Sequence, residues 1–221
     1  MKIIAIASPA GGVGKTTLAH AISVAAAEFG KKTLLIDLDP AGSLTFRLGF
    51  ENPRLTITDY LTGQSLSGEN LDLTSERFAF IPADSRATTD LNNDSLSILL
   101  NQLPEDFDLI VLDTAPSLTQ SLKLALSVAD HIFTPVDGSL HSLRALVQLR
   151  AMTDIAVTAV ASGEVNIEEH SPTLDIALLR SSEMDGLITG TRSILTVDKS
   201  GEIAESYRSA TYSILEILGL E

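Results

Sequence analysis

The sequence predicts an α/β fold in which a doubly wound, mostly parallel β-sheet is flanked by helices. Two observations lead to this prediction. Short apolar runs alternate with longer segments of helical pattern along the chain, which is typical of a parallel sheet built from βαβ units. A glycine-rich segment, Gly11–Thr17, stands between the first apolar run and the first helical segment. The 221 residues are enough for one such domain and few for two, so we expect a single domain over residues 1–221.

Composition excludes several classes of protein. Hydrophobic residues make up 44% of the chain, which is ordinary for a globular protein. No apolar run approaches the roughly 20 residues of a membrane-spanning helix, and the apolar start, Met1–Ala7, is too short for the core of a signal peptide. The chain has no cysteine, which excludes disulfides and thiolate metal sites. We therefore expect a cytoplasmic protein.

The net charge of −14 is unevenly distributed. Residues 1–50 contain five Lys and Arg against three Asp and Glu, residues 51–150 six against fourteen, and residues 151–221 four against twelve. An acidic surface repels nucleic acid and anionic lipid unless basic residues gather locally. The charge by itself indicates solubility and no particular partner.

The start of the chain predicts one βαβ unit. Ile3–Ala7 is a short apolar run typical of a buried parallel strand. Lys15–Phe29 has a helical pattern and ends at Gly30, with two lysines directly after it. Thr33–Ile36 is the next strand, and we expect the crossover between the two strands to be right-handed.

The rest of the chain continues the alternation. Four apolar runs are predicted as strands: Phe78–Ile81, Leu109–Leu112, His131–Pro135 and Leu174–Leu179. Four segments are predicted as helices: Asp84–Gln102, Leu118–Ala129, Ser139–Ile155 and Glu202–Leu218, the last capped by Gly219. The polar, acidic segment Ser162–Pro172 is expected to be a loop.

The glycine-rich segment is the strongest functional signal. It follows a predicted strand and opens a predicted helix, which is the setting of a phosphate-binding P-loop. Glycines allow backbone N–H groups to approach phosphate oxygens, and the helix dipole adds attraction. Lys15 is predicted to reach the β- and γ-phosphates, the Thr16 hydroxyl to bind Mg²⁺, and Thr17 to contact the α-phosphate. The predicted nucleotide-binding residues are Gly11, Gly12, Val13, Gly14, Lys15, Thr16 and Thr17.

Two carboxylates follow the second predicted strand, in the segment Asp37-Leu38-Asp39-Pro40. They stand two residues apart where a loop would approach the phosphates, so one could serve the Mg²⁺ shell while the other orients the attacking water. Asp-Pro is also a common turn pair, and a turn or a helix N-cap is the alternative interpretation. Beside a P-loop, the sequence favours the catalytic one.

A third signal is the apolar strand that ends in Asp113, within Leu109–Pro116. This is the Walker-B pattern, in which the carboxylate holds a water bound to Mg²⁺. Thr114–Ser117 would then form a loop that senses the γ-phosphate. The alternative is an aspartate that caps the next helix. The three motifs together predict the P-loop NTPase fold, with Thr16 and Asp113 at the metal and one carboxylate of the Asp37–Pro40 segment in its shell.

These motifs, in this order, resemble the ParA/MinD family of deviant-Walker ATPases. The resemblance is most specific in residues 3–49 and 107–137. It implies a single nucleotide-binding domain that forms an ATP-sandwich homodimer, hydrolyses ATP slowly with stimulation by a partner, and positions plasmids, chromosomes, septum inhibitors or microcompartments. By position it also implies Lys15 as the phosphate lysine, Thr16 as the Mg²⁺ ligand, Asp39 as the residue that orients the attacking water, and Asp37 and Asp113 as support for the metal.

The sequence departs from the family pattern at two positions. Ala10 stands where the family has a signature lysine that crosses the dimer interface to the partner's phosphates, and alanine supplies neither charge nor a hydrogen bond. Carboxysome-positioning members are similar in lacking this lysine and are said to carry one elsewhere. Arg144 is the first candidate for a replacement and Lys123 the second; an ordinary surface charge is the alternative for each. Ala41 stands where many members have glutamine, which bears on the nucleotide-sensing loop.

The carboxyl-terminal part of the chain bears on two further partners. Family members that bind DNA have basic residues there, whereas this chain has four among twelve acidic ones: Arg180, Arg192, Lys199 and Arg208. A symmetric dimer doubles any patch, so weak, non-specific DNA binding and nucleoid association stay open. The predicted helix Glu202–Leu218 is acidic on its polar face, unlike a membrane-binding helix, so we expect it to pack on the sheet and expect no membrane partner.

Three functions are compatible with these motifs. The first is a dimerising ATPase switch that positions cargo. The second is a small-molecule P-loop enzyme resembling dethiobiotin synthetase, and the third is a nucleotide-binding adaptor that does not hydrolyse ATP because position 10 lacks lysine. The segment Asp37–Pro40 and the short chain favour the first. The sequence has no guanine-binding Asn-Lys-x-Asp segment, so ATP with Mg²⁺ is the expected ligand rather than GTP.

Overall fold

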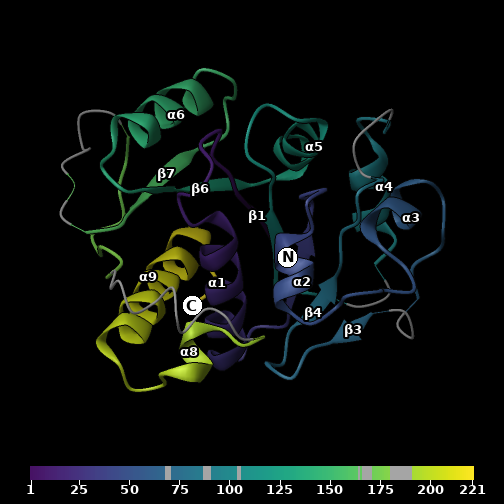
Figure 1. The fold of residues 1–221 in the computed structure, drawn as a ribbon, viewed down its shortest axis with the longest axis horizontal. Helices are drawn as coiled ribbons and strands as arrows, with labels where there is room; N and C mark the ends of the chain where they lie inside the picture. The colour runs from purple at the N-terminus through teal and green to yellow at the C-terminus, as the bar shows by residue number, and fades with distance from the viewer. Residues whose placement is uncertain (68–70, 87–90, 104–105, 164, 166–170, 180–190) are drawn as a thin grey trace.

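The computed structural model describes residues 1–67, 71–86, 91–103, 106–163, 165, 171–179 and 191–221. Within these ranges the centre of the molecule is a seven-stranded sheet in the order β3-β4-β2-β5-β1-β6-β7 (Figure 1). Neighbouring strands are parallel except the short β3, which runs antiparallel to β4. The strands are β1 (Lys2–Ile6), β2 (Thr33–Asp37), β3 (Asp72–Leu73), β4 (Ala79–Ile81), β5 (Leu109–Asp113), β6 (His131–Val136) and β7 (Val157–Ala161). The predicted mostly parallel α/β fold is confirmed.

Helices cover both faces of the sheet. One face carries α1 (Lys15–Glu28), α8 (Ile194–Val197) and α9 (Glu202–Leu218), which stand together in Figure 1. The other face carries α3 (Ile57–Leu61), α4 (Ser95–Asn101), α5 (Gln120–Val128) and α6 (Leu140–Arg150). The short α2 (Ser43–Arg47) lies beside the start of α1. None of the helices in the described ranges is long and apolar enough to cross a membrane.

The central strands are buried on both sides, which is why they appear in the sequence as continuous apolar runs. In β2, Leu35 packs with α1 and α9, whereas its neighbours Leu34 and Ile36 pack with the helices of the other face. This alternation is the two-residue period of a strand. The sheet is therefore packed on both faces, so a functional site is expected in the loops at its edges.

The carboxyl ends of β2, β5 and β1 lie side by side. Asp37, the last residue of β2, is in register with Asp113, the last residue of β5, which is in register with Ile6 of β1. The strand order reverses here, because the chain continues from β1 toward β2 on one side and later places β6 on the other. Ligands of doubly wound sheets bind at such a switch point. The fold thus brings the three predicted motifs to one edge.

Both predicted glycine caps are confirmed. Helix α1 ends at Glu28, and Gly30 follows with φ of 80°. Helix α9 spans the predicted residues, and its C-cap Gly219 has φ of 66°. This backbone conformation is strained for residues with a Cβ, so glycine ends the helix there. Helix α9 packs on α1 and the sheet, as expected from its apolar face.

The predicted helix Asp84–Gln102 is wrong in its first part. Residues 87–90 lie outside the described residues, and the helix that follows is only α4. Asp84 instead accepts hydrogen bonds from both the backbone N–H and the side chain of Arg86. Bonds of this kind offer the chain a turn in place of a helix.

The predicted strand Leu174–Leu179 is also wrong. This stretch approaches the edge of the sheet through isolated bridges, and the edge strand is β7, which the sequence analysis left unassigned. Leu174 and Leu178 are apolar because they enter the core shared with α9, without a continuous ladder. The helix predicted over Ser139–Ile155 is shorter, since α6 ends at Arg150. Much of the predicted loop Ser162–Pro172 lies outside the described residues.

A buried cluster ties α1 to α8. His20 of α1 and Glu76, in the turn before β4, are both almost fully buried, and His20 Nε2 lies 2.6 Å from Glu76 Oε2. The other oxygen of Glu76 accepts hydrogen bonds from the Ser193 N–H and the Thr196 hydroxyl. Burial alone would raise the pKa of Glu76, but these hydrogen bonds outweigh it and hold the pKa below its usual value. Glu76 therefore joins three separate segments.

We predict that Glu76→Ala lowers the free energy of unfolding by about 3 kcal/mol, because it leaves a buried imidazole, N–H group and hydroxyl without partners. Urea denaturation of the nucleotide-free protein measures the loss. Glu216→Ala, at an exposed glutamate of α9, is the control and should change stability by less than about 0.5 kcal/mol. Equal stability of the two variants would contradict the role given to the cluster.

Candidate functional site

The predicted P-loop joins β1 to α1 at the switch point. Gly12 and Gly14 have φ of 75° and 98°, and Gly14 is the N-cap of α1. A residue with a Cβ would be strained at either position. The loop therefore has the backbone geometry that lets N–H groups and the amino end of a helix surround a phosphate.

Lys15 lies across this loop. Its side chain is almost fully buried, and its ammonium group donates a hydrogen bond of 2.7 Å to the carbonyl oxygen of Ala10. Burial lowers the pKa of Lys15, while the charges of Asp113 and Asp39 act in the opposite direction. The predicted phosphate lysine is thus within electrostatic reach of two of the predicted carboxylates.

Asp113 is a fully buried carboxylate whose negative charge is only weakly compensated. Neither of its oxygens has a hydrogen-bond partner of normal geometry among the described residues. Burial raises the pKa of Asp113 well above its usual value and neighbouring Asp37 adds to the shift, while the Thr16 hydroxyl opposes it. Buried acceptors without donors cost roughly 1–3 kcal/mol, so they call for a functional explanation. The residues fit Mg²⁺: Thr16 would be a direct ligand and Asp113 would hold a metal-bound water.

Asp37 is equally buried but fully engaged. Its Oδ1 accepts a hydrogen bond from the Asp39 N–H (2.9 Å), and its Oδ2 accepts one from the N–H (3.0 Å) and one from the hydroxyl (2.7 Å) of Thr45. Burial raises the pKa of Asp37 to about 6, although these hydrogen bonds act in the opposite direction. Asp37 therefore positions the Asp39 loop and α2. Its role as a metal ligand stays a prediction.

Asp39, the predicted catalytic residue, is half-buried at the start of a turn. Its Oδ1 accepts a hydrogen bond of 2.9 Å from the Ala41 N–H, and its carbonyl oxygen accepts one of 2.8 Å from the Gly42 N–H. The turn and catalytic interpretations are compatible, because Oδ2 makes no hydrogen bond to the described residues. That oxygen is available to orient a water.

The segment predicted to sense the γ-phosphate is bonded to the P-loop side of the site. The Ser117 N–H donates to the carbonyl of Pro9 (3.0 Å), and the Thr114 hydroxyl donates to the carbonyl of Ile6 (2.9 Å). Ser117 has φ of 73°, which is uncommon for a residue with a side chain. The two loops therefore form one unit at the edge of the sheet.

Ala10, which the sequence analysis places at the position of the family's signature lysine, is fully buried. It packs with Val13 and with Ala145 of α6, so a longer side chain at this position would require α6 to move. Arg144, the residue before Ala145, is exposed. Lys123 is exposed on α5, where it borders a groove formed with the loop after α6. Arg144 is therefore next in sequence to the residue by which α6 contacts the P-loop, whereas no P-loop residue lines the groove at Lys123.

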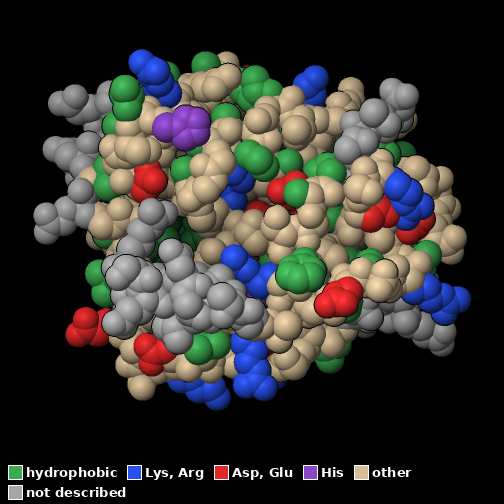
Figure 2. Space-filling view, viewed as in Figure 1, with side chains coloured by type: hydrophobic (Ala, Val, Ile, Leu, Met, Phe, Trp, Pro, Cys, Tyr) green, Lys and Arg blue, Asp and Glu red, His purple; other side chains and the backbone are tan. Residues whose placement is uncertain are grey.

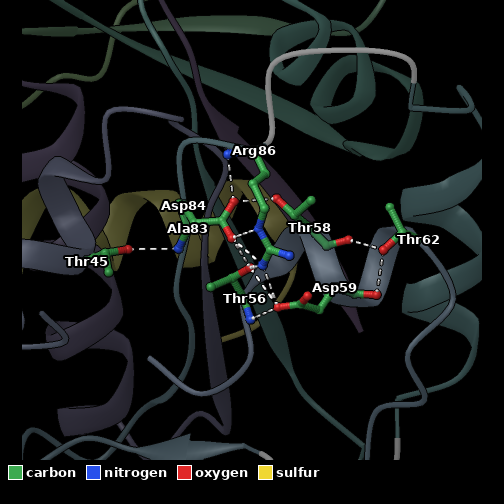
Figure 3. Close-up of polar contacts among 8 residues, drawn as sticks. All are labelled: Thr45, Thr56, Thr58, Asp59, Thr62, Ala83, Asp84 and Arg86. Atoms are coloured by element: carbon green, nitrogen blue, oxygen red, sulfur yellow. Dashed lines mark hydrogen bonds and ion pairs between the residues drawn. The ribbon is translucent and has the colours of Figure 1, made fainter. Parts of the chain in front are cut away.

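Two residues of α2 belong to the site and were missed by the sequence analysis. Thr45 binds Asp37, and its hydroxyl oxygen accepts a hydrogen bond of 2.8 Å from the Ala83 N–H, as Figure 3 shows. Arg47 donates a hydrogen bond of 3.1 Å to the Thr17 hydroxyl. Neither carries a sequence signal, because both act through tertiary contacts of a five-residue helix.

Comparison with known proteins decides the family. A protein-family profile described as an AAA domain matches residues 1–160. The chain is 34% identical over 151 residues to the chromosome-partitioning ATPase Soj of Thermus thermophilus, covering 67% of this chain and 59% of Soj. It is 32% identical over 158 residues to the maintenance of carboxysome distribution protein A of Synechococcus elongatus, covering 67% of this chain and 63% of that protein. The chain belongs to the ParA/MinD family of P-loop ATPases.

Membership of the ParA/MinD family confirms the resemblance seen in the motifs and makes the chain part of a family of partitioning and positioning ATPases. The chain spans less than two thirds of the length of these two relatives. Its fold is similar to that of the septum-site-determining protein MinD of Pyrococcus horikoshii in complex with Mg-ADP. The TM-score is 0.82 at 20% identity, and the alignment covers 99% of this chain and 98% of that one. The predicted P-loop NTPase fold is thereby confirmed.

We predict that Asp113→Asn stabilises the nucleotide-free protein, because it removes a carboxylate whose negative charge is disfavoured by burial and by neighbouring Asp37. A gain of about 1 kcal/mol raises Tm by about 2–4 °C for a chain of this size. The same variant should lose most of the rise in Tm that Mg-ATP gives the wild type. Differential scanning fluorimetry measures both effects, with the exposed Asp154→Asn as the control. Destabilisation by Asp113→Asn would contradict this account of the site.

Proposed function

We propose that this protein is an ATP- and Mg²⁺-dependent ATPase switch that dimerises with ATP bound and positions an intracellular cargo. The observation that carries the proposal is the fully buried carboxylate of Asp113, which accepts no hydrogen bond of normal geometry from the described residues and lies near Lys15 at the switch point of the sheet. A purely structural aspartate would be hydrogen-bonded, as Asp37 is. The names of the two relatives, a chromosome-partitioning ATPase and a carboxysome-distribution protein, support the positioning of a cargo.

In this proposal each site residue has one task. Lys15 and the backbone of the P-loop bind the β- and γ-phosphates. Thr16 and Asp113 would hold Mg²⁺, which neutralises charge on the phosphates. Asp39 orients the attacking water with the carboxylate oxygen that does not hold the turn. Asp37 keeps Asp39 in place through the hydrogen bond to its backbone N–H.

The surface around the site suits a homodimer. Large apolar side chains from α2, from the loop before α5 and from the start of α6 are exposed near this edge of the sheet: Phe46 (70%), Leu118 (45%) and Leu140 (64%). Apolar side chains gathered around a polar site favour cover by another protein surface. Arg144 is exposed about one turn along α6 from Leu140, and we infer that it supplies the partner's phosphates with the cation that Ala10 lacks.

We infer a cytoplasmic location and an activating partner protein from the family resemblance. The described surface does not favour non-specific DNA binding. Of the four basic residues in the carboxyl-terminal part, Arg208 is paired with Glu28 at 2.8 Å, and Arg180 lies outside the described residues. On the face drawn in Figure 2, basic side chains are scattered among acidic ones. A DNA-binding surface would instead gather them.

We predict that Mg-ATP converts the purified protein from monomer to dimer in size-exclusion chromatography with light scattering. Lys15→Ala should stay monomeric, because it cannot hold the phosphates. Asp39→Ala should dimerise but lose at least about tenfold in ATP turnover, measured as phosphate release. The exposed Asp175→Ala is the matched control. A wild-type protein that stays monomeric with Mg-ATP would refute the proposed switch. Unchanged turnover by Asp39→Ala would refute the proposed role of Asp39 in the reaction.

We predict that Arg144→Ala weakens the ATP-dependent dimer by about tenfold or more, because it removes a charge that faces the partner's phosphates. Binding of ADP to the monomer should not change. Lys123→Ala is the matched control, since Lys123 is a second exposed cation whose groove lies away from the P-loop. Sedimentation velocity with Mg-ATP gives the dimer Kd. Dimers of equal Kd for Arg144→Ala and the wild type would exclude Arg144 from this role.

A further inference from the structure

Arg47 is a half-buried cation beside the P-loop helix. It is the last residue of α2, and its Nη1 donates a hydrogen bond of 3.1 Å to Oγ1 of Thr17. Thr17 lies in the first turn of α1, directly after Lys15 and Thr16. Arg47 is therefore held beside the end of the P-loop that is predicted to contact the α-phosphate of a nucleotide.

Helix α2 is fixed in this position by Thr45. The Thr45 hydroxyl donates to Asp37 at the end of β2 and accepts from the Ala83 N–H after β4, so it joins α2 to two strands. Figure 3 shows this hydroxyl directed at Ala83, next to the ion pairs made by Arg86. Arg47 follows Thr45 by two residues in the same helix. Its side chain is thus presented by an element that is already ordered, which lowers the entropic cost of binding an anion.

The guanidinium group of Arg47 has more donors than partners. It carries five N–H donors, yet among the described residues it makes one hydrogen bond, to a neutral hydroxyl, and no ion pair. Burial lowers the pKa of Arg47, while the negative charge of Asp113 acts in the opposite direction. The planar guanidinium of arginine suits carboxylate and phosphate partners, which accept two of its hydrogen bonds at once. Asp113 is the complementary case in the same site, since its oxygens accept no hydrogen bond of normal geometry from the described residues.

We propose that Arg47 is a phosphate-binding residue that contacts the α-phosphate of the nucleotide bound in its own subunit. The inference rests on the proposed function, because it requires a nucleotide in the P-loop. A nucleoside phosphate bearing Mg²⁺ satisfies both unmatched groups at once, since its phosphate oxygens accept from Arg47 and the metal shell donates to Asp113. Arg47 thereby supplies within one subunit part of the positive charge that Ala10 does not supply.

The position of Arg47 predicts which nucleotides it affects. The α-phosphate is common to ADP and ATP, so loss of Arg47 should weaken both to the same degree. A cation that crosses a dimer interface, as proposed for Arg144, acts only in the ATP-bound dimer. The ratio of ADP affinity to ATP affinity therefore separates the two arginines.

The test is the Kd of Mg-ADP and of a non-hydrolysable Mg-ATP analogue, measured by isothermal titration calorimetry at low protein concentration. Arg47→Ala should weaken both by roughly 10- to 100-fold, as expected for the loss of a charge-assisted hydrogen bond. Arg47→Lys, which keeps the charge but loses the planar group, should recover part of the loss. Arg54→Ala, at an exposed arginine outside the site, is the matched control and should bind like the wild type.

Three outcomes would overturn the inference. One is Arg47→Ala with both Kd values within about twofold of the wild type while the protein remains folded by circular dichroism. Another is a loss of affinity confined to the ATP analogue, which would indicate that Arg47 acts at the dimer interface instead. The third is a lower Tm with unchanged Kd values, which is the result of a purely structural contact with Thr17. A wild type that binds neither nucleotide would instead refute the proposed function itself.

Discussion

The candidate site depends on two aspartates that end neighbouring parallel strands. Asp37 and Asp113 are in register and fully buried, so each raises the cost of a negative charge on the other. The structure stabilises the two carboxylates to different degrees. Asp37 receives three hydrogen bonds, whereas Asp113 receives none of normal geometry from the described residues. Thr45 gives two of those three bonds. Thr45, which lies outside the predicted motifs, thus determines which of the two carboxylates is hydrogen-bonded.

Because of this difference, the two aspartates have separate roles, one in stability and the other in the proposed function. Asp37 joins β2, α2 and the turn at Asp39, so its hydrogen bonds hold the site together before any nucleotide binds. The burial of Asp113 without a hydrogen bond of normal geometry among the described residues instead lowers the folding stability, and we propose that bound Mg²⁺ offsets this loss. The His20–Glu76 cluster and the two-sided core stabilise the domain away from this edge, which allows the edge to carry such a cost.

Sequence patterns predict what depends on local chemistry or on burial from both faces. The buried strands β1, β2 and β5, the P-loop and the glycine that ends α9 are of this kind. The patterns fail where distant contacts decide, as when Leu178 is apolar because α9 covers it, although its segment forms no continuous ladder. They fail in the same way at Asp84, whose bonds to Arg86 replace a helical turn. The different tasks of Asp37 and Asp113 could not be predicted either, because both simply end an apolar run.

The packing of Ala10 against Val13 and Ala145 leaves no room at this position for the longer side chain of a lysine. A signature lysine stands on the P-loop itself, so one side chain couples nucleotide binding to dimerisation. Here that position is filled by the apolar contact of Ala10 with Ala145, and the two candidate cations stand on different helices. Arg47 is carried by α2, which is tied to Asp37, whereas Arg144 is exposed on α6. A cation within the subunit strengthens the binding of ADP and ATP alike. A cation on the partner strengthens only the binding of the nucleotide that is present in the dimer. In our proposal the two cations act separately, so that nucleotide affinity and dimer affinity can change independently, unlike with a single lysine on the P-loop.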